Sequence, residues 1–243
     1  MHRGKASISL NCVLPLVRTM ADPKAVASRI EALLKSKYRQ IPRDDNEKIV
    51  DAVLKLWFQI LDRKMSGKSM LQEVAEVIHR SLMFQEIAIA IRDPKDGLYR
   101  YQIIMGFTKD VADALKTLAY SEAEARAIDR LPGIQVSRLI DVTISEAPQK
   151  AGEAATFNRP TLVAVPRKAD DEFTFGDYMC ILIPGRDDEV LGYIELSGPR
   201  DMKMPTGNRM KALELLAITI GIALQCQKQK DTRPAENQPL EMI

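Results

Sequence analysis

Cysteine and histidine are scarce in this chain. Its 243 residues include three cysteines, Cys12, Cys180 and Cys226, which lie far apart and form no Cys-x-x-Cys pair, and only two histidines, His2 and His79. This scarcity excludes a disulfide framework, a sulfur-rich zinc site and a histidine-rich metal site, and it removes most catalytic triads that depend on histidine. Because few cysteines are typical of reducing compartments, we expect a cytoplasmic protein.

The chain also lacks an excess of charge of one sign and a long apolar run. Its 35 lysines and arginines stand against 33 acidic residues, a formal charge of +2. Nucleic-acid affinity rests on the neutralisation of many phosphates, so this balance disfavours DNA or RNA as a partner. The most apolar segment, residues 212–224, contains Glu214 and is shorter than the ~20 residues that cross a bilayer, so we expect no membrane span.

What the sequence does contain is typical of a globular protein, with 46% hydrophobic and 28% charged residues. The two ends differ from this pattern. Residues 1–24 are expected to be a disordered leader, because Pro15 and polar residues interrupt their apolar stretch and no cleavage site follows. Translation starts at Met1 or at Met20. Residues 229–243 are polar and rich in proline, which predicts a flexible tail.

Helical spacing dominates the first third of the chain. Residues 25–64 are expected to form N-terminal helices, a short amphipathic one over 25–38 and a longer one over 45–61 with a wide apolar face. Ser69 and Gln72 have the spacing of a capping box, which predicts the start of a third helix. The inner face of this third helix consists of apolar residues at helical spacing, namely Leu71, Val74, Ala75, Ile78 and Leu82.

The hydrophobic period then changes to two, which predicts strands. Residues 86–92 and 98–105, joined by the turn sequence Asp93-Pro-Lys-Asp-Gly97, predict a β-hairpin. Residues 178–184 and 190–197 predict a second hairpin around a turn that begins at Gly185.

Between and after the hairpins the pattern is irregular. We expect, in chain order, a helix over 111–118, a helix over 125–130 that follows a capping box of Ser121 and Glu124, a short strand within 136–144, and a loop over 146–160. Residues 161–166 are apolar after Thr161, which predicts a central strand covered on both faces. Residues 205–227 predict a long closing helix.

This order of elements predicts an α+β domain, with one antiparallel sheet, helices packed on one face and the N-terminal and C-terminal helices adjacent. The residues also resemble a family. Residues 86–97 are similar to the first hairpin of GAF domains, Glu189-Val-Leu-Gly-Tyr-Ile-Glu-Leu resembles their last strand, and residues 213–224 resemble their closing helix, although Thr219 stands where glutamine is frequent. We assign residues 65–228 to a GAF-like domain.

The resemblance implies a non-catalytic regulatory domain. Such domains bind a small molecule between the sheet and the central segment, or dimerise through their first and last helices and signal to a partner protein. No cysteine lies between Phe107 and Gly176, where methionine sulfoxide reductases of this fold carry theirs. The Asn-Lys-Phe-Asp-Glu signature of cyclic-nucleotide binding and the Cys-His pair of bilin binding are absent as well, so no cofactor is identified.

The closing helix carries a structural prediction of its own. Between Ala212 and Leu224 it is apolar on more sides than one sheet can cover. The helix between Ile49 and Leu61, which includes Trp57, is the natural cover, within one chain or across a two-fold axis. We expect a homodimer formed through these two helices, and a monomer in which they pack on each other is the alternative.

A cleft over the sheet would be lined by the strands and the central segment. Its candidate residues combine aromatic walls with guanidinium donors that suit a small ligand, including an anionic one, and they are Phe107, Tyr120, Arg138, Phe157, Arg159 and Tyr178. For Arg138, the alternative to ligand binding is a structural role in a salt bridge with Asp141 or Glu146. No catalytic residue and no metal site is expected.

Two other functions remain open at this point. A small-molecule enzyme in the same cleft, thiol-based and similar to methionine sulfoxide reductases, requires that Cys180 or His79 faces the ligand. A purely structural dimer with a filled cleft requires no ligand at all.

Overall fold

The computed structural model describes residues 31–32, 35, 45–61, 67–126, 134–145, 156–163 and 165–231. The chain divides into two compact units, Met1–Ile41 and Pro42–Ile243, and all elements below belong to the second. The expected leader, most of the helix expected over 25–38, the larger part of the loop expected over 146–160 and the tail beyond 231 lie outside the described residues.

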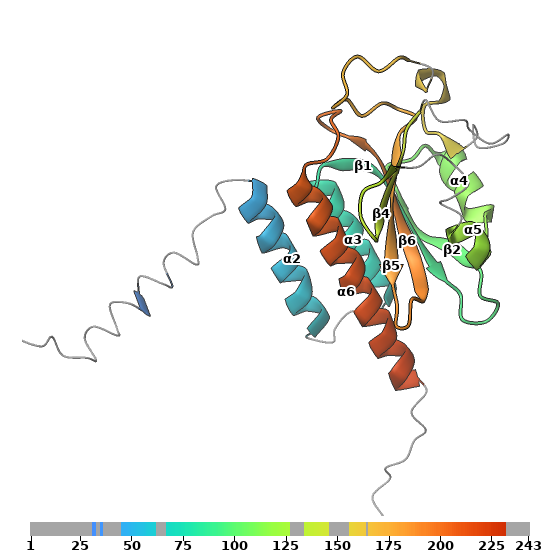
Figure 1. The fold of residues 1–243 in the computed structure, drawn as a ribbon. Coiled ribbons are helices and arrows are strands. Elements are labelled where there is room, and N and C mark those ends of the chain that lie inside the picture. Colours follow the sequence, from blue (N-terminus) through green and yellow to red (C-terminus); the bar gives the residue numbers. More distant parts are fainter. Residues whose placement is uncertain are drawn as a thin grey trace, which may run out of the picture. The chain divides into compact units, whose positions relative to one another are not determined.

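A six-stranded antiparallel sheet forms the centre of the fold (Figure 1). Its strands are β1 (Phe84–Arg92), β2 (Tyr99–Met105), β3 (Ile134–Gln135), β4 (Ile140–Thr143), β5 (Tyr178–Pro184) and β6 (Val190–Pro199). They lie in the order β2-β1-β6-β5-β4-β3, so that β1 and β6, which are distant in the sequence, are neighbours in the middle. Both predicted hairpins, β1–β2 and β5–β6, are confirmed.

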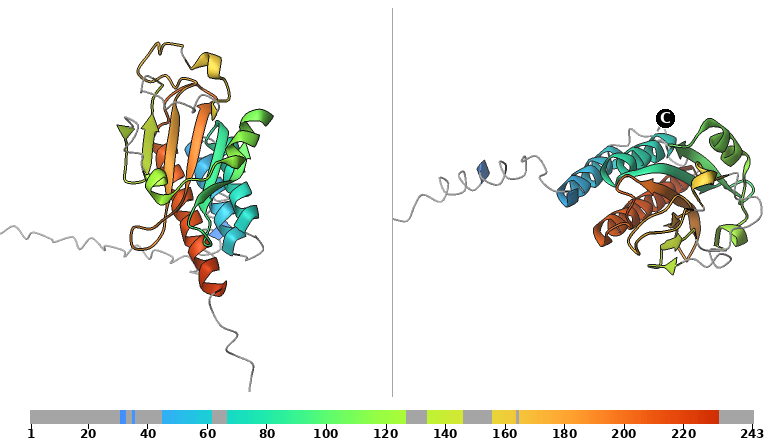
Figure 2. Two further views of the ribbon diagram at one scale, coloured as in Figure 1. Left: turned by 90° about the vertical axis from the view of Figure 1, so that its right-hand side faces the viewer. Right: turned by 90° about the horizontal axis from the view of Figure 1, so that it is seen from above.

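The α-helices lie on both sides of this sheet (Figure 2). They are α2 (Asp45–Leu61), α3 (Gly67–Ser81), α4 (Lys109–Thr117), α5 (Glu122–Arg126) and α6 (Gly207–Asp231). The first two and α6 form a layer on one face, in which α2 contacts both α3 and α6, whereas α4 and α5 lie on the other side. The α+β class, the helix layer on one face and the adjacency of the N-terminal and C-terminal helices are therefore confirmed.

The two predicted capping boxes have different outcomes. At α5 the backbone N–H and the hydroxyl of Ser121 both donate to Glu124 Oε2, at 2.8 and 2.7 Å, and the Glu124 N–H donates back to Ser121 Oγ at 3.3 Å. At α3 the prediction is wrong, because the helix begins at Gly67 and Ser69 lies in its first turn. The predicted inner face of α3 is buried nevertheless.

The central strand predicted over residues 161–166 is wrong. Pro160–Leu162 form a 3-10 helix, η3, and Val165 is 45% exposed. Proline explains the difference at both ends, since its fixed φ at Pro160 favours the first position of a helical turn and Pro166 has no N–H for a sheet ladder. An apolar run this short does not distinguish a strand from a turn.

Alternation along the central strands gives the sheet two different faces. The face toward α3 and α6 is apolar and fully buried, with Ile87 and Ile89 of β1 and Ile194 of β6 in the main core. Their neighbours along the strands, including Glu86 and Glu195, point to the opposite face. In the middle of β1 the core therefore takes alternate residues, Ile87 and Ile89, and leaves the others for a second layer, in which Ala90 belongs to a separate apolar cluster.

The helix α6 is apolar on more than one side, as predicted. Residues 207–227 are long enough and apolar enough to cross a membrane by length and composition. Leu213, Leu216 and Ile220 are nevertheless fully buried in the core against the sheet, and α2 packs beside the helix. Burial in the core accounts for the apolar residues on this inner side.

The close contact between α6 and β5 predicts an unusual response to a helix-stabilising change. A Cβ atom at Gly221 would lie 2.1 Å from the backbone oxygen of Pro184, whereas one at Gly207 would meet nothing within 4 Å. We expect Gly221→Ala to lower the free energy of unfolding by about 1–3 kcal/mol, although alanine normally stabilises a helix interior. Gly207→Ala serves as the matched control and should change it by less than about 0.5 kcal/mol in urea denaturation. Equal effects of the two variants would contradict the packing described.

Candidate functional site

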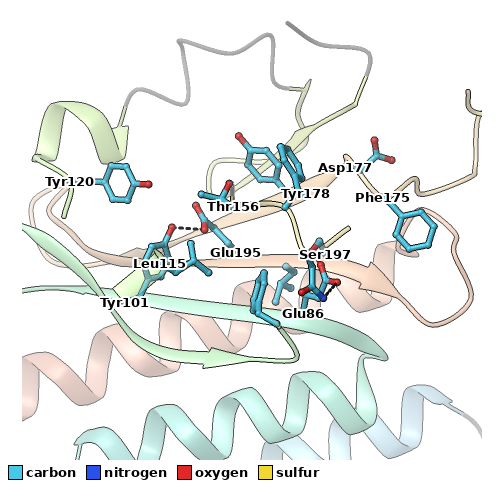
Figure 3. Close-up of a pocket in the computed structure, with 14 residues that line it drawn as sticks. Glu86, Tyr101, Leu115, Tyr120, Thr156, Phe175, Asp177, Tyr178, Glu195 and Ser197 are labelled. Atoms are coloured by element: carbon cyan, nitrogen blue, oxygen red, sulfur yellow. Dashed lines mark hydrogen bonds between the residues drawn. The ribbon is translucent and has the colours of Figure 1, made fainter. Parts of the chain in front are cut away.

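A cavity of about 120 Å³ lies over the face of the sheet that points away from α2, α3 and α6 (Figure 3). The sheet contributes Glu86, Tyr101, Tyr178, Glu195, Leu196 and Ser197 to its lining. The segments that cover this face contribute Phe107, Leu115, Tyr120, Thr156, Phe157, Asn158, Phe175 and Asp177. Aromatic rings and carboxylates thus dominate the lining.

Glu195 lies at the floor of the cavity, on the central strand β6. The Tyr101 hydroxyl, from β2, donates to Glu195 Oε2 at 2.7 Å (Figure 3). Burial, together with the Glu195 carboxylate, raises the pKa of Tyr101 well above its ordinary value, so the phenol keeps its proton at neutral and moderately alkaline pH. Tyr101 therefore acts as a neutral donor that holds a carboxylate in place.

Tyrosine rings pack around this hydrogen bond. The ring centroids of Tyr101, Tyr120 and Tyr193 are 6.0 to 6.4 Å apart, with edge-to-face geometry in each pair. Such pairs contribute beyond the area they bury, because the positive edge of one ring meets the negative face of the next. This cluster fixes the tyrosine wall of the cavity.

A second carboxylate, Glu86, anchors the covering segment. Asn158 Nδ2 donates to Glu86 Oε1 at 2.7 Å and to the Gly106 oxygen at 3.2 Å, while Asn158 Oδ1 accepts from the Thr108 N–H at 2.7 Å. Glu86 Oε2 accepts from the Ser197 hydroxyl on β6. One amide side chain therefore fastens the segment that carries Phe157 to the ends of β1 and β2.

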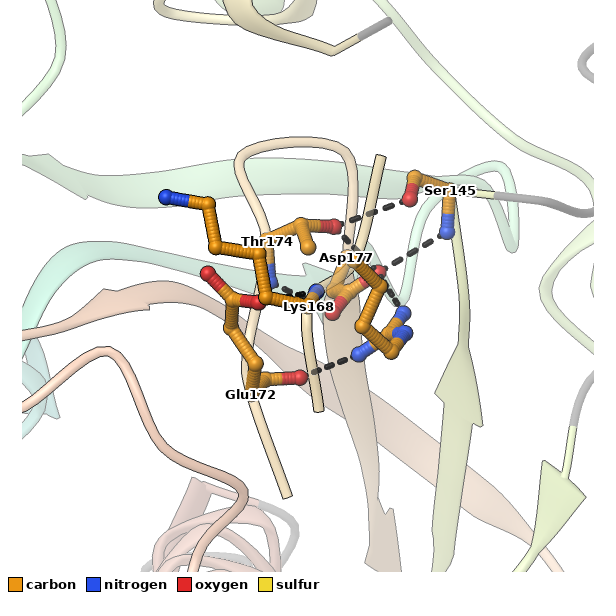
Figure 4. A network of polar contacts seen from close by, with 6 residues as sticks. Ser145, Lys168, Glu172, Thr174 and Asp177 are labelled. Atoms are coloured by element: carbon orange, nitrogen blue, oxygen red, sulfur yellow. Dashed lines mark hydrogen bonds and ion pairs between the residues drawn. The ribbon is translucent and has the colours of Figure 1, made fainter. Parts of the chain in front are cut away.

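Asp177 is the centre of a buried polar network at the other end of the cavity (Figure 4). It is 1% exposed and accepts from the N–H groups of Thr174 and Ser145 at 2.7 and 2.8 Å. The Thr174 hydroxyl and Arg167 Nη2 also donate to it, both at 2.9 Å. The side chain of Arg167 is only 13% exposed, so this is a buried ion pair. The network fixes the position from which Tyr178 and Phe175 reach the cavity.

Removal of the charge at Asp177 should be costly, because the buried guanidinium of Arg167 would lose its ion pair with this carboxylate. We expect Asp177→Asn to lower the free energy of unfolding by about 3 kcal/mol. The matched control is Asp171→Asn, because the ion pair of Asp171 with Lys203 has side chains 63% and 64% exposed, and we expect a loss below about 1 kcal/mol. Urea denaturation of both variants measures the difference, and similar losses would refute the structural role assigned to Asp177.

Four of the six residues predicted for the site lie together. Phe107, Tyr120, Phe157 and Tyr178 all line the cavity. Their contact with a ligand remains a prediction.

The two arginines predicted for the site lie elsewhere. Arg138 is exposed and forms an ion pair with Asp188, which is neither of the partners considered from the sequence. Arg159 is exposed, and its guanidinium lies 5.2 Å from the centre of the Phe175 ring without lining the cavity. The lining described by the structure therefore has no guanidinium donors.

The acidic residues of the lining were missed by the sequence analysis, although a signal existed. Glu195 lies between Ile194 and Leu196, and Glu86 directly precedes the apolar run over residues 87–91. The strand register pairs Glu86 with Ser197 and Ala88 with Glu195, which places both carboxylates on one face of two adjacent strands. A charged residue inside a buried strand indicates a face that is not part of the apolar core.

Neither residue required by the thiol enzyme alternative lines the cavity. Cys180 is buried, and burial together with the Glu195 and Asp141 carboxylates raises the pKa of its thiol well above the ordinary value, which disfavours the reactive thiolate. His79 is on α3, with Nδ1 2.9 Å from the Phe84 oxygen and Nε2 3.0 Å from Arg200 Nη2. Within the described residues no group of three or more metal-binding side chains gathers.

The fold of this chain is similar to that of solved GAF domains. The GAF domain of a phosphoenolpyruvate-protein phosphotransferase from Coxiella burnetii has a TM-score of 0.51 at 14% identity, over 78% of this chain and 100% of that one. A GAF domain/HD domain protein from Geobacter sulfurreducens has a TM-score of 0.51 at 8% identity, over 69% and 98% of the two chains. No protein-family model and no curated protein sequence matches. The chain therefore has a GAF-like fold, as the sequence motifs predicted.

Proposed function

We propose that this protein is a non-catalytic regulatory domain that binds a small molecule in the cavity described above and acts in the cytoplasm. The observation that carries this proposal is the cavity itself, which lies between a polar face of the sheet and a covering layer that buried polar contacts hold in place. A fold without a ligand has no need to keep carboxylates and tyrosines around a space in its second layer, since apolar side chains would fill it at lower cost.

The central strands provide a route from the cavity to the helix layer. Glu86 and Glu195 face the cavity, while Ile87 and Ile194, their neighbours in the sequence, pack in the core with α3 and α6. A ligand that shifts β1 relative to β6 would alter the packing of these helices, and the free energy available is limited to the difference in its affinity for the two arrangements. The altered helix layer would then change the binding of a partner protein or of a second copy of the chain.

Native mass spectrometry tests the binding role directly. Protein purified from its source under gentle conditions is expected to show a mass excess of one small molecule, which is lost on denaturation. Re-addition of the released molecule at about a hundred times its Kd should stabilise the protein by about 2.7 kcal/mol. A chain mass without excess, together with no thermal shift on addition of the cell's small-molecule extract, would support the purely structural role instead.

The outer side of the helix layer supports dimerisation as the second element of the proposed function. Two stripes of exposed apolar side chains run along the adjacent helices α2 and α6, and they consist of Val50, Leu54 and Phe58 and of Leu215, Ile218 and Ile222, each 39% to 59% exposed. Together they expose on the order of 500 Å² of apolar surface, the patch size that marks interaction sites. With a polar rim, this patch approaches the ~800 Å² per partner of a standard interface.

We assign these two stripes to an interface with a second copy of the chain, because exposed apolar side chains on neighbouring helices can pair with their symmetry equivalents across a two-fold axis. Trp57, in contrast, is half-buried against the core within one chain, so the pairing of α2 with α6 inside the chain and the pairing between chains use different sides of α2.

Light scattering of the purified chain tests the dimer. We expect twice the chain mass for the natural sequence at micromolar concentration and a monomer for Ile222→Glu, because the interface would bury a charge within the apolar patch. The control is Ile134→Glu, since Ile134 is 52% exposed on the edge strand β3 and belongs to neither stripe. A monomeric natural protein, or dissociation by both substitutions, would contradict this assignment.

A further inference from the structure

Arg167 joins two parts of the loop over residues 165–177, which contributes Phe175 and Asp177 to the lining of the cavity. Its Nη1 donates to the backbone oxygen of Glu172, and its Nη2 donates to Asp177 at 2.9 Å (Figure 4). The guanidinium is largely buried, so water competes little for these contacts. A displacement of the cavity wall at Asp177 is therefore passed on to Glu172.

The same loop is paired with the connection between β6 and α6. Residues 171–173 and 202–204 run antiparallel around a bridge between Glu172 and Lys203. Two backbone hydrogen bonds join them, from the Phe173 N–H to the Met202 oxygen at 2.9 Å and from the Met204 N–H to the Asp171 oxygen at 2.7 Å. We call these two paired segments the clasp.

Both segments of the clasp are held firmly in place. The side chain of Phe173 is fully buried, and its ring lies edge-to-face against Phe84, the first residue of β1, with the ring centres 6.4 Å apart. Met202, in the other segment, has a left-handed backbone conformation with φ at +51°. This conformation is unfavourable for residues other than glycine and persists only where the surrounding contacts hold it.

The clasp leads directly into α6. Pro205 and Thr206 are the residues between it and Gly207, where the helix begins. Pro205 is buried, and its ring fixes the backbone φ angle. Arg209, in the first turn of α6, forms an ion pair with Asp201 at 2.8 Å, and its side chain is only 15% exposed. Few bonds can rotate between the clasp and the helix, so the position of the clasp determines that of the first turn.

From these contacts we infer that the clasp couples the cavity to the helix layer, so that a change at Phe175 or Asp177 alters the first turn of α6. This regulation rests on the proposed function for its input, because a ligand must enter the cavity, whereas the coupling itself is a property of the fold. The clasp acts at the beginning of α6 and adds a second route to the one through β1 and β6. Cooperative opening of the loop, the clasp and the first turn of the helix is its physical content.

Hydrogen exchange of the full chain, followed amide by amide by NMR, tests the coupling without a ligand. The Met204 N–H reports on the clasp, and the Met210 N–H, which donates to the Thr206 oxygen at 3.0 Å, reports on the first turn of α6. Lys203→Glu replaces the ion pair with Asp171 by repulsion and does not alter the lining of the cavity. We expect the exchange of both amides to rise about fivefold, because a cooperative unit opens as a whole.

Lys116→Glu is the matched control. The ion pair of Lys116 with Asp113 on α4 has side chains 62% and 54% exposed, close to the 64% and 63% of Lys203 and Asp171. This control should leave the exchange of the Met204 and Met210 amides unchanged. Faster exchange in the clasp without a change in the helix, or an equal response to the control, would overturn the inference.

A second pair of variants tests the input from the cavity. Phe175→Ala and Phe107→Ala both remove a ring from the lining, and of the two residues only Phe175 belongs to the loop. We expect Phe175→Ala to speed exchange at Met210 at least about threefold and Phe107→Ala to leave it unchanged. In the presence of Lys203→Glu the effect of Phe175→Ala on Met210 should largely disappear, because the two substitutions act through one unit. Additive effects would contradict the coupling.

The results separate the clasp from the function that supplies its input. Thermal unfolding establishes that each variant is folded, and the exposed substitution Lys203→Glu tests the coupling even if the loss of the Phe175 ring unfolds the chain. If Met210 responds to neither substitution while a small molecule copurifies with the chain, the inference fails and the ligand-binding role stands. If the amides respond as expected but no small molecule copurifies, the coupling stands and the proposed function fails.

Discussion

The alternation of side chains along β1 and β6 is the constraint on which the rest of the structure depends. Ile87 and Ile194 belong to a fully buried core that α3 and α6 complete. Because consecutive side chains of a strand point to opposite faces, this core also determines what faces the other way, including Glu86 and Glu195. A shift of one residue in the register would bury both carboxylates under the helices, which makes the observed pairing strongly preferred.

The second layer combines a smaller apolar cluster, which includes Tyr99, Ala125 and Tyr193, with polar contacts. Asn158 ties the covering segment to Glu86 and Gly106, and Arg167 with Asp177 fixes the chain that leads into β5. All buried polar side-chain atoms of the described residues have hydrogen-bond partners. Buried ion pairs are weak sources of net stability but leave few alternative arrangements. This arrangement can preserve a small cavity, because directional contacts hold its walls apart without filling the space between them.

Much of the fold could be predicted from the sequence, because its signals were local. The turn sequence from Asp93 to Gly97 specifies the first hairpin, and the box of Ser121 and Glu124 specifies the start of α5. The strand predicted over 161–166 was wrong because the prediction rested on hydrophobicity alone. It gave no weight to Pro160 and Pro166 at the two ends of the segment.

The candidate site was predicted only in part, because its chemistry depends on contacts distant in the sequence. Aromatic residues such as Phe107 and Tyr178 could be proposed from their place in the central segment. Arg138 could not be placed, since its partner Asp188 lies in the turn of the other hairpin. The relation between Glu86 and Glu195 appears only when β1 is paired with β6, and no local pattern specifies that pairing.

Cysteine accessibility in β6 tests the two-faced sheet most directly. In a chain whose natural cysteines are replaced by serine, single substitutions Ser197→Cys and Ile194→Cys place a thiol on the cavity face and on the core face of one strand. The account predicts that a small methanethiosulfonate reagent modifies the first variant under native conditions and leaves the second unmodified until the protein unfolds. Equal modification of both thiols, or modification of the second alone, would contradict it.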